Sequence, residues 1–223
     1  MVVGALFIIA TVAGVVGNLG FSTPLLDSPD YLTSASASGN NAILGAVFEM
    51  IGALAAVSIA IWLYPVLRRY NEGLALGAVG FRLVECVLYV IAIVALLSIL
   101  TLSREFVIAG AADASVFRAA GTSLQAVRDW AGQLSVVAFA PAALMYYSVF
   151  YQSRLIPQWL SGWGFIAAAL CLSAALLRMF GLIVFLSPVF LMMVLPLALQ
   201  EMVLAVWLIA RGFNQSAIAS LSS

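Results

Sequence analysis

The chain has 223 residues, of which 65% are hydrophobic and 8% are charged, and its mean hydropathy is +1.17. The nine basic residues are all Arg and balance nine acids, and His is absent, so the sequence lacks a basic surface for nucleic acid. It also lacks the side chains for a Schiff-base lysine, a histidine-ligated haem or zinc, or a nucleophile paired with His.

The first apolar segment, near residues 2–20, has the length of either a signal peptide or a membrane span. It has no basic region before its apolar stretch and no small-residue cleavage motif directly after it. We therefore expect an uncleaved first transmembrane helix.

Five more apolar stretches are long enough to cross a bilayer, which takes about 20 helical residues. Turn-forming residues separate several of them, and Pro188 suits the first turn of the last helix. The sequence predicts an all-α polytopic membrane protein, with residues 1–223 forming a single helical bundle. The expected transmembrane helices lie near 2–20, 42–66, 74–101, 130–151, 158–180 and 188–211.

Between residues 102 and 129 lies the one long polar connection; the other loops are short. The pattern predicts a surface-lying amphipathic helix, although a solvated loop is the alternative. Its expected apolar face consists of Val116, Ala119, Ala120, Leu124 and Val127, with Arg118, Gln125 and Arg128 elsewhere around the helix.

The short connections carry their arginines on one side of the predicted membrane. These are Arg68, Arg69, Arg154 and Arg211, whereas Asp27 and Asp30 fall on the other side. Because positive residues favour the cytoplasmic side, we expect both termini to be cytoplasmic and the long connection to be external.

Five ionisable residues lie inside the apolar stretches: Glu49, Arg82, Glu85, Arg178 and Glu201. A charge at the centre of a membrane helix costs about 2.5 to 3.5 kcal/mol on insertion scales, so these side chains are expected to avoid lipid. Small residues at helical spacing around several of them favour close helix packing, which indicates that the charges point into the bundle.

Three of these charges are expected at a similar depth. With about 1.5 Å of rise per residue, Arg82 lies roughly 12 Å, Glu201 about 15 Å and Glu85 about 17 Å from the predicted cytoplasmic ends. Arg82, Glu85 and Tyr89 share one helix face. One Arg with two carboxylates leaves one acid in surplus, which makes the group a candidate ligand-binding or ion-coupling site.

Glu49 and Arg178 are both expected nearer the external face, and we predict that they pair between the second and fifth helices. Pro141 and Pro196 lie inside predicted helices and favour kinks there. Cys86 and Cys171 are expected to be small apolar fillers without a disulfide.

Three strings resemble a bacterial integral-membrane family known as domain of unknown function 4386. They are LYPVLRRYNEGLALGAVGFRLVE from Leu63, YQSRLIPQWLSGWG from Tyr151 and LPLALQEMVLAVWLIARGF from Leu195. The resemblance covers nearly the whole chain and includes Arg82 in the third helix and Glu201 in the sixth. It implies six helices in the plasma (inner) membrane and supplies no activity.

These features favour a protein that binds or transports a small molecule at the site formed by Arg82, Glu85, Glu201 and Tyr89. A non-catalytic scaffold or accessory subunit, whose charges only orient helices, is the alternative. An enzyme using Glu85 and Glu201 as acid and base is least favoured, since no nucleophile motif or metal-ligand set is visible. We expect no cofactor and no metal.

The expected partners are the lipid bilayer and a small-molecule or lipid ligand, with no nucleic acid. Gly73, Gly77 and Gly80 also leave open a homo-oligomer, since small residues at this spacing let helices approach.

Overall fold

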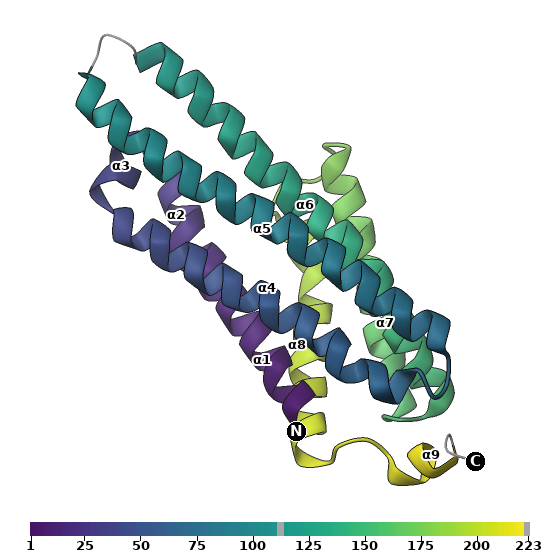
Figure 1. The fold of residues 1–223 in the computed structure, drawn as a ribbon. Coiled ribbons are helices and arrows are strands. Elements are labelled where there is room, and N and C mark those ends of the chain that lie inside the picture. Colours follow the sequence, from purple (N-terminus) through teal and green to yellow (C-terminus); the bar gives the residue numbers. More distant parts are fainter. Residues whose placement is uncertain (111–113, 221–223) are drawn as a thin grey trace. The chain divides into compact units, whose positions relative to one another are not determined.

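In the computed structural model, which describes residues 1–110 and 114–220, every regular element is helical (Figure 1). Six helical stretches are long and apolar enough to cross a membrane. They are Val2–Leu26, Gly39–Leu67, Glu72–Ala109, Ala114–Ser153, Gln158–Met179 and Pro188–Ala210. The predicted all-α class and the number of spans are therefore confirmed.

The first span is built from three consecutive elements. The α-helix α1 (Val2–Val15) continues as a π-helix, η1 (Val16–Ser22), and then as α2 (Thr23–Leu26). A short helix, α3 (Tyr31–Ala37), precedes the second span, α4 (Gly39–Leu67). π-Helical turns inside α-helices are rare and often occur at functional sites.

The third and fourth spans are longer than expected. Helix α5 (Glu72–Ala109) has 38 residues and α6 (Ala114–Ser153) has 40. At about 1.5 Å per residue each exceeds 55 Å, whereas the hydrocarbon core of a bilayer is about 30 Å thick. Outside residues 111–113, the predicted polar connection is therefore helical and continuous with the two spans rather than a separate surface helix.

The burial of Arg128 in that segment differs from the expected one. Val116 and Val127, expected on its apolar face, are 66% and 46% exposed, whereas Arg128, expected elsewhere around the helix, is 7% exposed. In a membrane protein the surrounding lipid is itself apolar, so the polar face can be the one that packs against other helices.

The last two spans, α7 (Gln158–Met179) and α8 (Pro188–Ala210), pack against each other. Helix α7 ends in a Schellman motif, in which Gly181 has φ 70° and its N–H donates to the Arg178 carbonyl, while Leu182 N–H donates to Leu177. Ser187 then caps α8 by accepting from Phe190 N–H at 3.3 Å. The apolar segment between these spans is therefore a defined turn. A short helix, α9 (Gln215–Ser220), follows.

The chain forms two compact units. Unit 1 comprises Met1–Ile9, Ala55–Cys86 and Gln133–Ser223, and unit 2 comprises Ala10–Leu54 and Val87–Gly132. Each of the helices α4, α5 and α6 is divided, with one part in unit 1 and the other part in unit 2. The single bundle over residues 1–223 stays a prediction.

Candidate functional site

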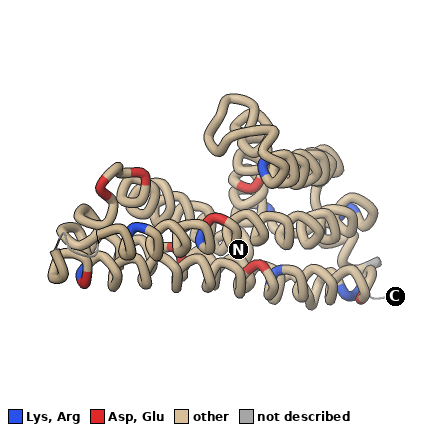
Figure 2. The backbone as a smooth tube through the Cα atoms, turned by 90° about the horizontal axis from the view of Figure 1, so that it is seen from above, with Lys and Arg blue, Asp and Glu red and all other residues tan. Residues whose placement is uncertain are grey.

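Charged residues are sparse along the chain (Figure 2). Two groups of buried or half-buried polar side chains stand out, one in each unit. We call the group of Ser22, Glu49 and Arg128 in unit 2 the Glu49 cluster. We call the group of Arg82, Glu85 and Glu201 in unit 1 the Arg82 cluster.

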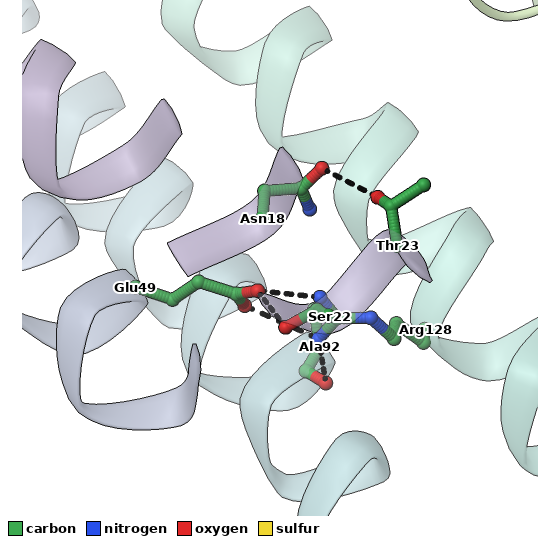
Figure 3. A network of polar contacts seen from close by, with 6 residues as sticks. All are labelled: Asn18, Ser22, Thr23, Glu49, Ala92 and Arg128. Atoms are coloured by element: carbon green, nitrogen blue, oxygen red, sulfur yellow. Dashed lines mark hydrogen bonds and ion pairs between the residues drawn. The ribbon is translucent and has the colours of Figure 1, made fainter. Parts of the chain in front are cut away.

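The Glu49 cluster is a closed hydrogen-bond network (Figure 3). Arg128 donates to both carboxylate oxygens of Glu49, from Nη2 to Oε1 at 2.6 Å and from Nη1 to Oε2 at 3.2 Å. The Ser22 hydroxyl donates to Oε1 at 2.7 Å, and Arg128 Nη1 also donates to the Ala92 carbonyl at 3.0 Å. Three donor contacts on a buried carboxylate and a matching cation make this cluster electrically neutral and well satisfied.

Small residues allow this network to form. A Cβ on Gly17 would lie 2.8 Å from the Glu49 backbone nitrogen, and a Cβ on Gly45 would lie 2.8 Å from Ser22 Oγ. The π-helix η1 and helix α4 therefore approach each other at backbone distance. Ser22, the last residue of η1, is fully buried and reaches Glu49 from there.

The cation at Glu49 differs from the expected one. We predicted Arg178 as its partner, whereas the structure pairs Glu49 with Arg128. Arg178 belongs to unit 1, where its guanidinium lies 4.6 Å from the ring centroid of Phe185.

In the Arg82 cluster, Arg82 and Glu85 form an ion pair one helical turn apart on α5. Nη1 of Arg82 donates to both oxygens of Glu85, at 2.9 and 3.2 Å, and the two residues are 3% and 6% exposed. The guanidinium of Arg82 also lies 4.5 Å from the ring centroid of Phe139, a cation–π contact from α6. Helix α6 thus covers the charged pair with an aromatic side chain.

Glu201 on α8 is half-buried and lies within electrostatic range of both Arg82 and Glu85. It makes neither a hydrogen bond nor an ion pair to the described residues. Tyr89, the fourth predicted site residue, is half-buried on α5 one turn beyond Glu85 and falls in unit 2. The structure therefore brings Glu201 near the ion pair of Arg82 without joining it to that pair.

Two further polar atoms near the ion pair are buried and lack a hydrogen-bond partner among the described residues. They are Nε of Arg82 and the hydroxyl of Tyr146, a fully buried residue on α6. The Arg82 guanidinium lies 5.9 Å from the centroid of the Tyr146 ring. The Arg82 cluster thus differs from the Glu49 cluster in holding unused donors and a carboxylate without a cation of its own.

The family model described as Domain of unknown function (DUF4386) matches residues 2–212 of the chain. The chain belongs to the DUF4386 family. The resemblance inferred from the three sequence strings is thereby confirmed. No curated protein and no solved structure matches the chain.

Sequence reasoning missed the residues that hold the Arg82 cluster of this DUF4386 protein in place. Gln200, fully buried beside Glu201, accepts a short hydrogen bond from the Tyr147 hydroxyl on α6 and donates to the Leu160 carbonyl on α7 at 3.0 Å. This side chain links α8 to two neighbouring helices, so it holds α8 against α6 and α7 next to Glu201. The signal available was an amide directly before the carboxylate of Glu201 in an otherwise apolar stretch.

Arg128 was also missed as a buried residue, because the sequence interpretation placed it in an external connection. The helical spacing of Gln125, Arg128 and Ser135 with the small residues Ala131 and Gly121 was the available signal. All of these except Gln125 are buried in the DUF4386 structure, and Gln125 donates to the Leu26 carbonyl at 3.1 Å.

Neither cluster resembles a metal centre. Across residues 1–110 and 114–220, no group of three Cys, Asp or Glu side chains comes together in a way that could hold a metal ion. Both cysteines, Cys86 and Cys171, are free thiols. The chemistry that the Arg82 cluster offers to a ligand is therefore hydrogen bonding and charge.

Proposed function

We propose that this DUF4386 protein binds a small polar solute at the Arg82 cluster and moves it across the membrane. The solute carries a positive charge, or is accompanied by a proton, which Glu201 receives. The observation that carries the proposal is the surplus of one carboxylate beside an ion pair that is already matched. Glu85 satisfies the charge of Arg82, so the charge of Glu201 is left for a ligand.

The energetics favour a ligand at this position. An ionised side chain deep in a membrane costs about 2.5 to 3.5 kcal/mol. Each buried polar atom without a hydrogen bond costs about 1 to 3 kcal/mol more. A solute with a cationic donor for Glu201 and an oxygen acceptor for Nε of Arg82 would offset the cost of the charge and that of the unpaired donor. A proton on Glu201 would offset only the cost of the charge.

The helix that carries Glu201 also has a feature suited to movement. Pro196 lies inside α8, five residues before Glu201, and Pro141 lies inside α6. A proline in a helix interior removes a backbone donor and weakens the helix at that point. We propose that binding at Glu201 favours one of two arrangements of α8 around Pro196, which gives the solute access from either side in turn.

Binding can be tested with purified protein in neutral detergent and with defined probes. Ethylammonium supplies a cationic donor alone, whereas ethanolamine and glycine also supply an oxygen acceptor. Thermal shift together with calorimetry reports binding of these probes. A proton is tested separately, by measuring proton uptake on a small acid step in weakly buffered solution. The variant Glu201→Gln removes the charge with little change in shape.

The matched control is Glu105→Gln, which removes an exposed carboxylate. If the ligand is a cationic solute, we expect Glu201→Gln to weaken probe binding about tenfold or more, because a charge-assisted hydrogen bond contributes about 1.5 to 3 kcal/mol. If the ligand is a proton, we expect the variant to take up one proton fewer than the wild type. Glu105→Gln should bind as the wild type does. Equal probe binding and equal proton uptake by Glu201→Gln and wild type would overturn the proposal.

A scaffold function is the second candidate, and the Glu49 cluster favours it. Every strong donor and acceptor of that cluster is matched, as expected for charges whose task is to fix helix positions. If the whole protein is a scaffold, Arg82 and Glu85, which form an ion pair on α5, should tolerate exchange of their charges in a double variant that folds. In the binding hypothesis the exchanged variant folds and no longer binds the probes.

We also propose that the protein resides in a bacterial inner membrane with both termini in the cytoplasm. The arginines of the short connections support this orientation, Arg154 and Arg211 among them. A reporter that fluoresces only in the cytoplasm can be fused after the last residue. We expect this fusion to be bright. A dark fusion accompanied by activity of a periplasmic reporter would reverse the orientation.

A further inference from the structure

Unit 1 contains a cavity of about 510 Å³ away from the Arg82 cluster. It lies where the turn between α6 and α7 meets the end of α8 and the segment that follows α8. The two arginines in its lining are Arg154 and Arg211, and the lining contains no acid. The cavity is therefore positively charged.

Neither arginine is neutralised by a neighbouring side chain. Among the described residues, no carboxylate lies within ion-pair distance of Arg154 or Arg211; Arg211 instead lies 5.9 Å from the ring centroid of Trp207. Both side chains are exposed. Their charges are available to an anion.

The backbone holds the two arginines in defined positions. Arg154 adopts φ 54°, a left-handed conformation that is uncommon for a residue with a side chain, and Gly212 after Arg211 adopts φ 67°. Asn214 fastens the two segments together, with its N–H donating to the Leu155 carbonyl at 2.9 Å. The cavity is thus a built feature of the fold and not a gap between loose loops.

A third group of donors faces the same region. Helix α7, with 22 residues, begins directly after Pro157, and no side chain caps its first turn. The N–H groups at the start of a helix and its dipole favour an anion, most of all a phosphate. Pro157 and Gln158 both line the cavity, so the start of α7 adds to the charge of the two arginines.

We propose that this cavity binds a phosphate ester. Arg154 and Arg211 would contact the phosphate oxygens, since guanidinium groups match phosphate geometry well. Trp207 in the lining and Trp159 nearby are amphipathic side chains typical of the membrane–water interface. That location favours the headgroup of an anionic phospholipid as the source of the phosphate, and a soluble phosphate monoester is the other source.

Native mass spectrometry of the purified full chain can measure binding of defined lipids and solutes. The probes are dioleoylphosphatidylglycerol, dioleoylphosphatidylcholine and glycerol 3-phosphate. The variants are Arg154→Asn, because Asn tolerates a positive φ, and Arg211→Gln, singly and together. The control is Arg68→Gln, which removes an exposed arginine that does not line the cavity.

We expect phosphatidylglycerol to bind the wild type and Arg68→Gln equally. Each single variant should bind it about tenfold more weakly, and the double variant more weakly still, because each charge-assisted contact is lost. Equal melting temperatures of the variants and the wild type without lipid show that the variants are folded. If Arg154→Asn does not fold, Arg211→Gln alone tests the proposal. Phosphatidylcholine should bind more weakly, since its choline group cancels the phosphate charge.

The outcomes distinguish a lipid headgroup from a soluble phosphate ester, and they also test whether the cavity binds phosphate at all. If glycerol 3-phosphate binds as tightly as phosphatidylglycerol and needs the same arginines, the phosphate site is supported and the lipid source is wrong. If phosphatidylglycerol binds the double variant as tightly as the wild type, or phosphatidylcholine binds equally well, the proposal is overturned. Because Glu201 is not involved, these results are independent of the test at the Arg82 cluster.

Discussion

Removing Arg128 should destabilise the protein far more than removing any exposed arginine. In Arg128→Met the carboxylate of Glu49, 2% exposed, keeps a single strong donor, the hydroxyl of Ser22. Breaking a buried ion pair from one side costs about 3 to 5 kcal/mol, because a charge is left without compensation. A neutral interhelical hydrogen bond in a membrane protein contributes only about 0.6 kcal/mol on average. The size of the loss therefore tells whether the pair is ionic.

The assay is unfolding of the purified protein in mixed detergent and SDS, combined in a double-mutant cycle. The double variant Glu49→Gln with Arg128→Met removes both charges, and Gln can still accept from Ser22. We expect it to recover about 2 to 4 kcal/mol of the loss caused by Arg128→Met alone. The control Arg118→Met changes an exposed arginine on the same helix and should be close to neutral. A cost below about 1 kcal/mol for Arg128→Met, or a double variant as unstable as the sum of the singles, would refute the argument.

Three further substitutions test packing and polar contacts, all by the same unfolding assay. Gly17→Ala places a Cβ 2.8 Å from a backbone nitrogen of α4 and should cost about 1 to 3 kcal/mol, whereas Gly14→Ala meets nothing within 4 Å and should be neutral or stabilising. Gly164→Ala collides with the Tyr147 ring and should also cost about 1 to 3 kcal/mol; an unchanged stability would show that the ring moves freely. Gln200→Leu leaves the buried Tyr147 hydroxyl without its acceptor and should cost about 1 to 3 kcal/mol, while a neutral result would mean that Gln200 does not hold α8 in place.

Much of the fold could be predicted from the sequence because it depends on composition and length. Six apolar stretches of membrane-spanning length correspond to six observed helical spans. The third helix was expected to end near residue 101, which is too early. Hydropathy identifies only the apolar part of a helix, so it does not detect a helix that continues into a polar segment. No proline interrupts the sequence from there to Ala109, so α5 continues.

The partners of the buried charges were harder to predict. Helical spacing correctly shows that Arg82 and Glu85 can meet on one helix, since three residues is less than one turn. The partner of Glu49 depends instead on how three helices approach each other and on the π-helical turn that delivers Ser22. Depth counted from helix ends placed Arg178 at a suitable level, but depth does not specify the angle around the helix or the neighbouring helix.

The carboxylates of Glu49, which is buried, and Glu201, which is half-buried, have very different surroundings. Glu49 has a cation, a hydroxyl donor and close helix packing around it, so its charge is neutralised within the protein. The cation near Glu201 is Arg82, which is already paired with Glu85. A helix-orienting charge gains nothing from such an arrangement, because an unpaired carboxylate destabilises the helix that carries it. The proposed binding of a cation or a proton at Glu201 would offset this cost.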